Sequence, residues 1–159
     1  MVEPKGSPSL PTPNFWEKKR LDQMTTWEWE SLCDGCGRCC LYVLQDTNTD
    51  RIFHTRVACQ FMDMATCRCL VYARRHELQP HCTILTPGNL EELACLPSTC
   101  AYKRVAQGQN LEWWHPLISG IPATVHLAGA SIWNKAIFGQ SIATDQLANY
   151  IIRDDEWNR

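Results

Sequence analysis

The chain has 159 residues, of which 45% are hydrophobic, and its net charge is −2 with a pI of about 6.2. This length suffices for one domain with a buried core, and the charge excludes a general electrostatic attraction to nucleic acid or to anionic membranes. Because the sequence shows neither a signal-peptide pattern nor an apolar run of the roughly 20 residues that a membrane span needs, we expect a cytoplasmic protein.

Residues 1–13 are rich in proline, serine and glycine and contain few apolar side chains. Such a segment cannot bury enough surface to fold, so we expect a disordered tail ahead of a single cysteine-rich, metal-binding domain at 14–159. Over 15–24, apolar residues recur among charged ones in the pattern of a short amphipathic helix. Thr25 and Glu28 then have the spacing of a capping box, which predicts a second helix immediately before the first cysteine.

Four cysteines follow within eight residues, in the run CDGCGRCC. Thiolate sulfur is a preferred ligand of zinc, copper(I) and iron–sulfur clusters, and the two-residue spacing lets one tight turn direct two sulfurs at a single ion. Glycines between the cysteines suit a backbone that must fold back on itself. The run therefore predicts half of a metal site or more, with the ligands Cys33, Cys36, Cys39 and Cys40.

Two strand-like segments after this run flank the polar turn DTNTD, which predicts a β-hairpin. If the turn centres near Asn48 and Thr49, Cys40 and Cys59 lie on opposite strands at the open end of the hairpin. The hairpin is therefore expected to return Cys59 to the cysteine run.

Further cysteines follow in short, irregular segments. Cys67 and Cys69 form a C-x-C pair, which alternates faces in a strand but can share a site in a turn, and Cys82 comes later. The segment LEELACL predicts a short helix. Another helix is expected to hold Cys100 in its first turn, where backbone N–H groups favour a thiolate.

Residues 111–129 are expected to be mostly irregular, and Thr144 is expected to cap a C-terminal helix. The predicted fold class is α+β, mainly short helices with one β-hairpin and much irregular structure around a cysteine-rich metal centre.

The ten cysteines have other interpretations. In a secreted protein they would indicate a disulfide framework, whereas in a reducing cytosol clustered cysteines more often hold metal or do redox chemistry. Ten thiols could serve two sites of four ligands, or one site with additional redox or structural thiols. Adjacent Cys39 and Cys40 rarely bind one ion without strain, so they are candidates for ligands of different centres.

Spacing alone does not decide between zinc and iron. The C-x2-C-x2-C string resembles part of a bacterial ferredoxin motif, but here another cysteine follows at once. A zinc ribbon would show two separated C-x2-C pairs. Four arginines either offset thiolate charge or belong to a solvated surface: Arg38, Arg68, Arg74 and Arg75.

In combination, CDGCGRCC, VAC, TCRC, LPSTCAY and WHPL resemble the YcgN-type branch of the bacterial CxxCxxCC (YkgJ-like) family over about residues 15–126. The resemblance implies a small cytosolic protein that chelates zinc or iron. It implies nine metal-ligand cysteines: Cys33, Cys36, Cys39, Cys40, Cys59, Cys67, Cys69, Cys82 and Cys100.

Residues outside the family pattern are interpreted separately. Cys95 is interpreted as a buried apolar thiol. Three histidines are less favoured as metal ligands: His54, His76 and His81. His115 and His126 fit the pattern and remain candidates for a functional role, although each is expected to be a hydrogen-bonded structural histidine.

The leading hypothesis is a metal-binding protein that holds zinc or an iron–sulfur cluster, 4Fe–4S included, through clustered thiolates. The broader family includes flagellin lysine N-methylase, so an iron–sulfur-dependent enzyme is the alternative by analogy. The chain shows no Gly-rich nucleotide loop after a strand and no catalytic triad or carboxylate pair. A thiol redox or disulfide protein is the third hypothesis. The sequence indicates no substrate and no protein partner.

Overall fold

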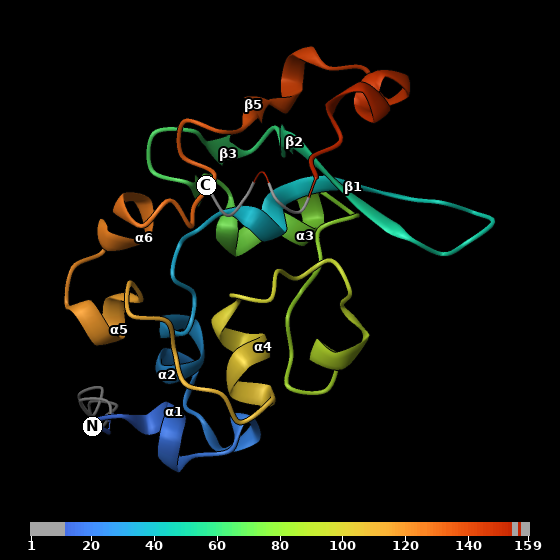
Figure 1. Ribbon diagram of the computed structural model, residues 1–159. Coiled ribbons are helices and arrows are strands. Elements are labelled where there is room, and N and C mark those ends of the chain that lie inside the picture. Colours follow the sequence, from blue (N-terminus) through green and yellow to red (C-terminus); the bar gives the residue numbers. More distant parts are fainter. Residues whose placement is uncertain (1–11, 154–155, 157–159) are drawn as a thin grey trace, which may run out of the picture.

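Figure 1 shows the computed structural model, which describes residues 12–153 and residue 156. Most of the predicted tail over 1–13 lies outside the described residues. Short helices, a small mixed sheet, a two-stranded sheet and long irregular connections make up the described part, so the fold is α+β, as predicted. No helix among the described residues has the length and apolar character that crossing a membrane requires.

The apolar residues at 15–24 form two short helical segments, not the single amphipathic helix that we predicted. Helix α1 spans Phe15–Lys18 and the 3₁₀ helix η1 spans Leu21–Gln23. The chain is extended between them, and this break is accompanied by a tertiary contact: Lys19 Nζ pairs with the Glu28 carboxylate at 2.8 Å.

The predicted capping box opens helix α2, Thr26–Ser31. Thr25 Oγ1 accepts from the Glu28 N–H at 3.2 Å, and Glu28 Oε2 accepts from the Thr25 N–H at 2.9 Å. The helix ends two residues before Cys33, so it fixes the direction from which the chain enters the cysteine run.

The predicted hairpin is confirmed. Strands β1 (Leu41–Gln45) and β2 (Ile52–Ala58) pair antiparallel, and their connection projects from the rest of the molecule (Figure 1). Asp46 Oδ1 holds the turn by accepting from the N–H groups of Asn48 and Thr49 at 2.8 and 3.2 Å. Strand β5 (Ile137–Phe138) adds parallel to the inner end of β2.

Short elements connect these parts of the chain. They are β3 Met62–Asp63, β4 Arg68–Cys69, η3 Tyr72–Arg74, α3 Arg75–Leu78, η4 Leu90–Glu92, α4 Ala101–Ala106, α5 Pro116–Ser119, α6 Thr124–Leu127, η5 Gly139–Ser141 and η6 Thr144–Tyr150. The predicted LEELACL and C-terminal helices are therefore 3₁₀ segments. The region predicted to be mostly irregular contains α5 and α6, because Pro116 occupies the first turn of α5 and Gly120 ends it in a left-handed conformation.

Two hydrophobic cores lie on either side of the cysteine run. One contains Phe15, Leu32, Leu90, Leu96, Ala101, Tyr102 and Leu111. The other contains Leu41, Ala58, Met62, Cys67, Ile132 and Ile152. Because Leu32 precedes the run and Leu41 follows it, residues 33–40 connect the two cores and are anchored at both ends.

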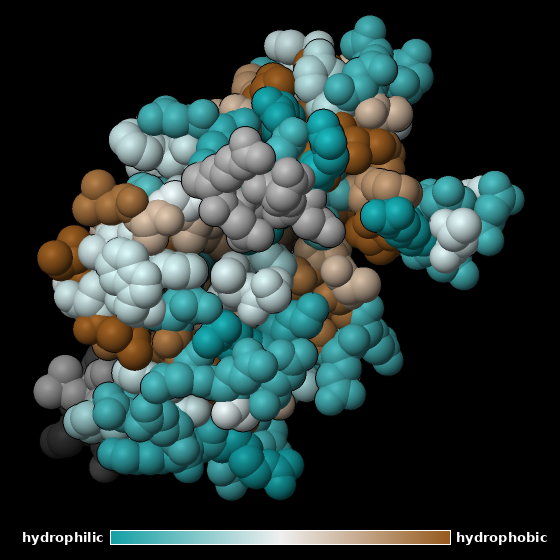
Figure 2. Space-filling model, in the orientation of Figure 1, coloured by the Kyte–Doolittle hydropathy of each residue, from teal (hydrophilic) through white to brown (hydrophobic). Residues whose placement is uncertain are grey.

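Figure 2 shows that apolar side chains gather on the surface over α5 and α6. Ile118, Ile121 and Leu127 are exposed there. This surface carries no cysteine, so it is separate from the candidate metal centre.

Candidate metal centre

The backbone of the cysteine run is held in a fixed fold. Gly35 and Gly37 both have φ in the left-handed region, at 76° and 74°, where a Cβ atom would be strained. A Cβ on Gly37 would also lie 2.8 Å from Ile132 Cδ1. The Ile132 N–H donates to the Cys36 carbonyl at 2.9 Å, so a segment almost one hundred residues later braces this turn.

His115 holds the start of the run and is not available as a ligand. Its side chain is buried, its Nδ1 accepts from the Leu117 N–H at 3.0 Å, and its Nε2 lies 2.9 Å from the Leu32 carbonyl. Because Nδ1 is the acceptor, Nε2 carries the proton and donates to Leu32. Burial lowers the pKa of His115, which favours this neutral form. The expectation of a hydrogen-bonded structural histidine is confirmed.

The hairpin brings Cys59 back to the run, as predicted. The Cys59 N–H donates to the Cys40 carbonyl at 2.9 Å, directly beyond the end of the β1–β2 ladder. Cys39 Sγ and Cys40 Sγ lie 4.0 Å apart. Two thiolates on one tetrahedral zinc are about 3.8 Å apart, given Zn–S bonds of about 2.3 Å. The two sulfurs are therefore close neighbours, and the assignment of Cys39 and Cys40 to different centres stays a prediction.

The first group of thiols contains Cys33, Cys36, Cys39 and Cys100. Cys33 and Cys39 keep contact with solvent, yet protein atoms surround them densely enough for burial to act on their pKa values. Burial raises the pKa of Cys33 to about 12, and the charge of Cys39 adds to the effect. Burial also raises the pKa of Cys100 to about 11, with a smaller contribution from Cys39. These sulfurs thus lie within electrostatic range of one another.

Cys100 differs in one respect from the sequence expectation. It is the N-cap of α4, and the N–H groups of Lys103 and Tyr102 do lower its pKa. Burial outweighs them, so the free thiol is protonated at neutral pH. A thiolate at this position requires a cation that replaces the proton.

The second group contains Cys59, Cys69 and Cys82 and adjoins Cys39. Burial raises the pKa of Cys82, Arg75 opposes this, and the charges of Cys69, Cys59 and Cys39 raise it further. Gln79 Nε2 donates to Cys59 Sγ at 3.9 Å. Cys39 therefore lies where the two groups meet, and Cys40 is beside it.

Cys67 lies beside the cysteine run, since a Cβ on Gly37 would be 3.4 Å from its own Cβ, whereas Cys95 lies outside both hydrophobic cores. Cys67 is 3% exposed and packs in the second core, and burial followed by the charge of Asp63 raises its pKa, with no cysteine contributing. Cys95 is half-buried and belongs to neither core, so the interpretation as a buried apolar thiol is wrong. Its carbonyl lies 2.8 Å from His54 Nε2, and Cys39 contributes to its raised pKa after burial.

The predicted charge compensation is found at two arginines. A Cβ on Gly35 would lie 2.8 Å from Arg68 Cζ, so the guanidinium packs against the turn of the cysteine run, and it lowers the pKa of Cys33. Arg75 stacks on Tyr72 at 3.9 Å and lowers the pKa of Cys82. Arg74, in contrast, pairs with Glu77 at 2.9 Å on the surface.

The remaining histidine of the family pattern is also structural. His126 Nδ1 lies 2.7 Å from the hydroxyl of Ser131, which is buried beside Ile132. The contact supports the segment that braces the Cys36 turn.

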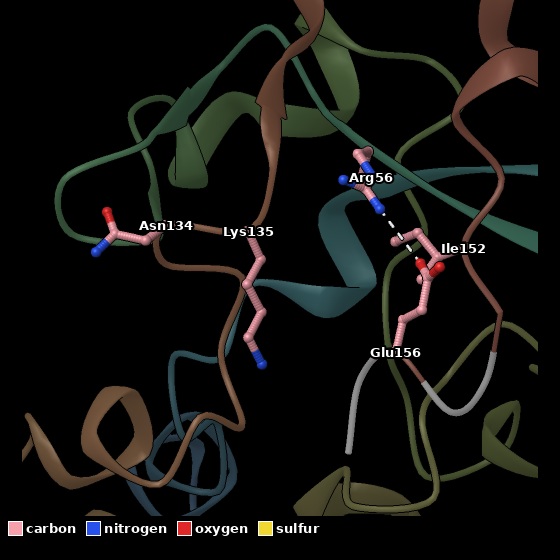
Figure 3. Close-up of a pocket in the computed structure, with 5 residues that line it drawn as sticks. All are labelled: Arg56, Asn134, Lys135, Ile152 and Glu156. Carbon is pink, nitrogen blue, oxygen red and sulfur yellow. Dashed lines mark hydrogen bonds and ion pairs between the residues drawn. The ribbon is translucent and has the colours of Figure 1, made fainter. Parts of the chain in front are cut away.

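The pocket drawn in Figure 3 offers no metal-binding alternative to the cysteine region. The pocket in Figure 3 has a volume of about 250 Å³ and is lined by Arg56, Asn134, Lys135, Ile152 and Glu156. Arg56 and Glu156 pair across it at 3.2 Å. It contains no cysteine, and its one carboxylate is already paired with an arginine.

The donor set fits a thiophilic metal, although the side chains are not arranged around one point. Within the described residues, no three His, Cys, Asp or Glu side chains converge in a position to bind a metal ion. All ten cysteines are free thiols, and those of the two groups have backbones fixed around Cys39. Rotation of cysteine side chains, with loss of their protons, is what metal binding would require.

Comparisons with known proteins agree with this donor set. Residues 32–101 match the family model CxxCxxCC, described as "Putative zinc- or iron-chelating domain". A UPF0260 protein of Gluconacetobacter diazotrophicus is 53% identical over 126 residues, which are 79% of each chain. One of Brucella canis is 54% identical over 121 residues, or 76% of this chain and 80% of its own.

A third relative, from Parvibaculum lavamentivorans, is 46% identical over 138 residues, or 87% of this chain and 90% of its own. No solved structure matches the chain significantly. On these identities and coverages, the chain belongs to the UPF0260 family, and its cysteine run lies in the CxxCxxCC domain.

Proposed function

We propose that this protein binds a zinc ion or an iron–sulfur cluster through the thiols that surround Cys39, in a cytoplasmic setting that keeps them reduced. The observation that carries the proposal is the position of Cys39. Its sulfur is 4.0 Å from that of Cys40, and its charge acts on Cys33, Cys36, Cys82 and Cys100.

The electrostatics of these thiols support binding of a cation. Each additional thiolate raises the pKa of its neighbours, so several of them cannot be charged together without a compensating positive charge. A metal ion supplies that charge and makes thiolates favourable. The chain's own part is to fix the donors: glycines shape the turn, His115 and Ile132 brace it, and the hairpin returns Cys59.

The structural consequence would be a link between the two cores. A structural thiolate site supplies apparent binding energies on the order of 10–16 kcal/mol, which is comparable to the whole stability of a domain. Arg68 and Arg75 would neutralise part of the remaining negative charge of such a site.

Anaerobic purification of the full chain, followed by metal analysis and a visible spectrum, tests the proposal. Stoichiometric zinc in a colourless protein, or iron with sulfide and a broad visible band, is the expected result. Cys36→Ser should lose most of the metal, whereas Cys95→Ser, outside the family pattern, should retain it. Protein that contains no metal after anaerobic preparation, and that takes up neither zinc nor a reconstituted cluster, would contradict the proposal.

A further inference from the structure

The helix pair α5 and α6 carries an apolar surface without charge. Residues 113–134 contain no Asp, Glu, Lys or Arg, and no other stretch of the chain is as long without them. Four large apolar side chains of this stretch are between 44% and 78% exposed, and we call them the α5–α6 surface: Ile118, Ile121, Leu127 and Trp133. Figure 2 shows brown side chains gathered over the two helices, at the left of the view. Large apolar patches on a soluble protein usually mark a binding site.

Contacts within the chain fix the parts of this surface relative to one another. The hydroxyls of Ser119 and Thr124 lie 2.7 Å apart and join α5 to α6. The His126 ring of α6 lies 5.8 Å from the Trp133 ring, and its Nδ1 is 2.7 Å from the Ser131 hydroxyl. The surface is therefore formed before a partner arrives, which lowers the entropic cost of association.

The charges that flank this surface in the sequence are engaged inside the chain. Glu112 pairs with Arg104 at 2.8 Å, and the Lys135 ammonium donates to the Gly129 carbonyl. The residues of the surface itself offer no charge to a phosphate group, an acidic peptide or an anionic membrane. What binds there has to be apolar and uncharged where it makes contact.

Other exposed apolar side chains have charged groups beside them. Tyr72 carries the Arg75 guanidinium 3.9 Å above its ring, and Leu78 directly follows Glu77. Two identical copies that met through these residues would bring like charges near each other, which opposes association. The α5–α6 surface is free of this repulsion, because the same surface on a second copy is equally uncharged.

We propose that the α5–α6 surface binds the same surface of a second copy of this chain and forms a two-fold symmetric dimer. In such an interface both partners present the same residues, so an apolar surface without charge is its own complement. At about 200 Å² for a full side chain, the four residues expose roughly 500 Å², close to the roughly 600 Å² per partner of a small specific interface. An interface of this size predicts a dissociation constant in the micromolar range.

Sedimentation velocity of the full chain, over a concentration series that spans the micromolar range, measures the monomer–dimer equilibrium. Reducing buffer excludes disulfide-linked dimers, and measurement with and without added metal excludes copies bridged by metal-bound thiolates. Leu127→Lys should raise the dissociation constant about 10-fold or more, because it removes an apolar anchor and places two like charges in the interface. Leu70→Lys is the matched control: Leu70 is a 68% exposed leucine outside the surface, so this variant should match the wild type.

Ile121→Lys is a second variant of the same surface and should weaken the dimer as well. Because Ile121 and Leu127 are 54% and 78% exposed, both variants should keep the wild-type circular dichroism and urea midpoint. A wild-type chain that stays monomeric at every concentration would overturn the proposal. So would a dimer that neither variant weakens, because its interface would lie elsewhere. Binding of the wild-type monomer to phosphatidylcholine vesicles, lost in Leu127→Lys, would assign the surface to lipid instead of a second copy.

Discussion

The two groups of cysteines are built in different ways. Most of the first comes from one short stretch of chain, whose turn is shaped by glycines and braced by His115 and Ile132. The second is assembled from separate hairpins and loops, with Cys59 after β2 and Cys69 at the end of β4. The first group is therefore positioned by local backbone, whereas the second depends on pairing between distant segments. Variants that act on one group and not on the other test this difference.

The largest effect is expected for Cys39→Ser, because Cys39 adjoins both groups. This variant should lose the bound metal and with it an apparent binding energy on the order of 10 kcal/mol. Cys82→Ser should affect the second group alone. Metal analysis and thermal melting of the variants measure the difference. Equal metal loss in the two variants would remove the distinction between the groups.

His115→Ala should lower the free energy of unfolding by about 3 kcal/mol. It deletes a buried ring that supports the first group, and it leaves the Leu32 carbonyl and the Leu117 N–H without their partner. His126→Ala, at a less buried ring, is the control and should cost less. Urea unfolding measures both changes. A ring that serves only as a metal ligand would instead leave the metal-free stability unchanged.

Gly139→Ala should disturb the support of the second group. A Cβ at this position would collide with the Ala58 carbonyl, one residue before Cys59, and would push β5 away from β2. We expect the free energy of unfolding to fall by about 1–3 kcal/mol, which is typical of overpacked sites. Gly88→Ala meets no atom closer than 4.0 Å and should be nearly neutral. Denaturant midpoints of the two variants, measured without metal, test the difference.

The smallest effect concerns Glu28, on the helix that enters the cysteine run. The hydrogen bond from Lys19, followed by that from the Thr25 N–H, lowers the pKa of Glu28 below its usual 4.5. A depressed folded-state pKa adds stability above the unfolded-state value, and this is lost as the pH falls through the folded value. Stability should therefore fall below about pH 4.5 more steeply in the wild type than in Glu28→Gln. Parallel pH profiles of unfolding free energy would contradict this.

Local patterns predicted the parts of the fold that local forces determine. The Thr25–Glu28 capping box and the hairpin between β1 and β2 depend on neighbouring residues, and both are present. The parallel pairing of β5 with β2 joins segments about eighty residues apart, and β5, with two residues, is too short to show a strand pattern. Helix α5 is predictable from its sequence, because Pro116 and Gly120 are typical of the start and the end of a short helix.

The candidate site shows the same division. Spacing identified the cysteine run, and the hairpin predicted the return of Cys59. The burial of Cys67 in the second core and the half-exposed position of Cys95 follow from tertiary packing, which a cysteine pattern does not encode.

The placement of residues 33–40 between two cores has a consequence for cooperativity. Leu32 and Leu41 anchor the ends of this stretch in different cores, so neither core covers the whole stretch. Without metal, the two halves are joined by contacts such as that between His54 Nε2 and the Cys95 carbonyl, and we expect them to melt in separate steps. A metal held between them, as we propose, would make the halves a single folding unit, so its loss would first appear as a broadened or divided unfolding transition.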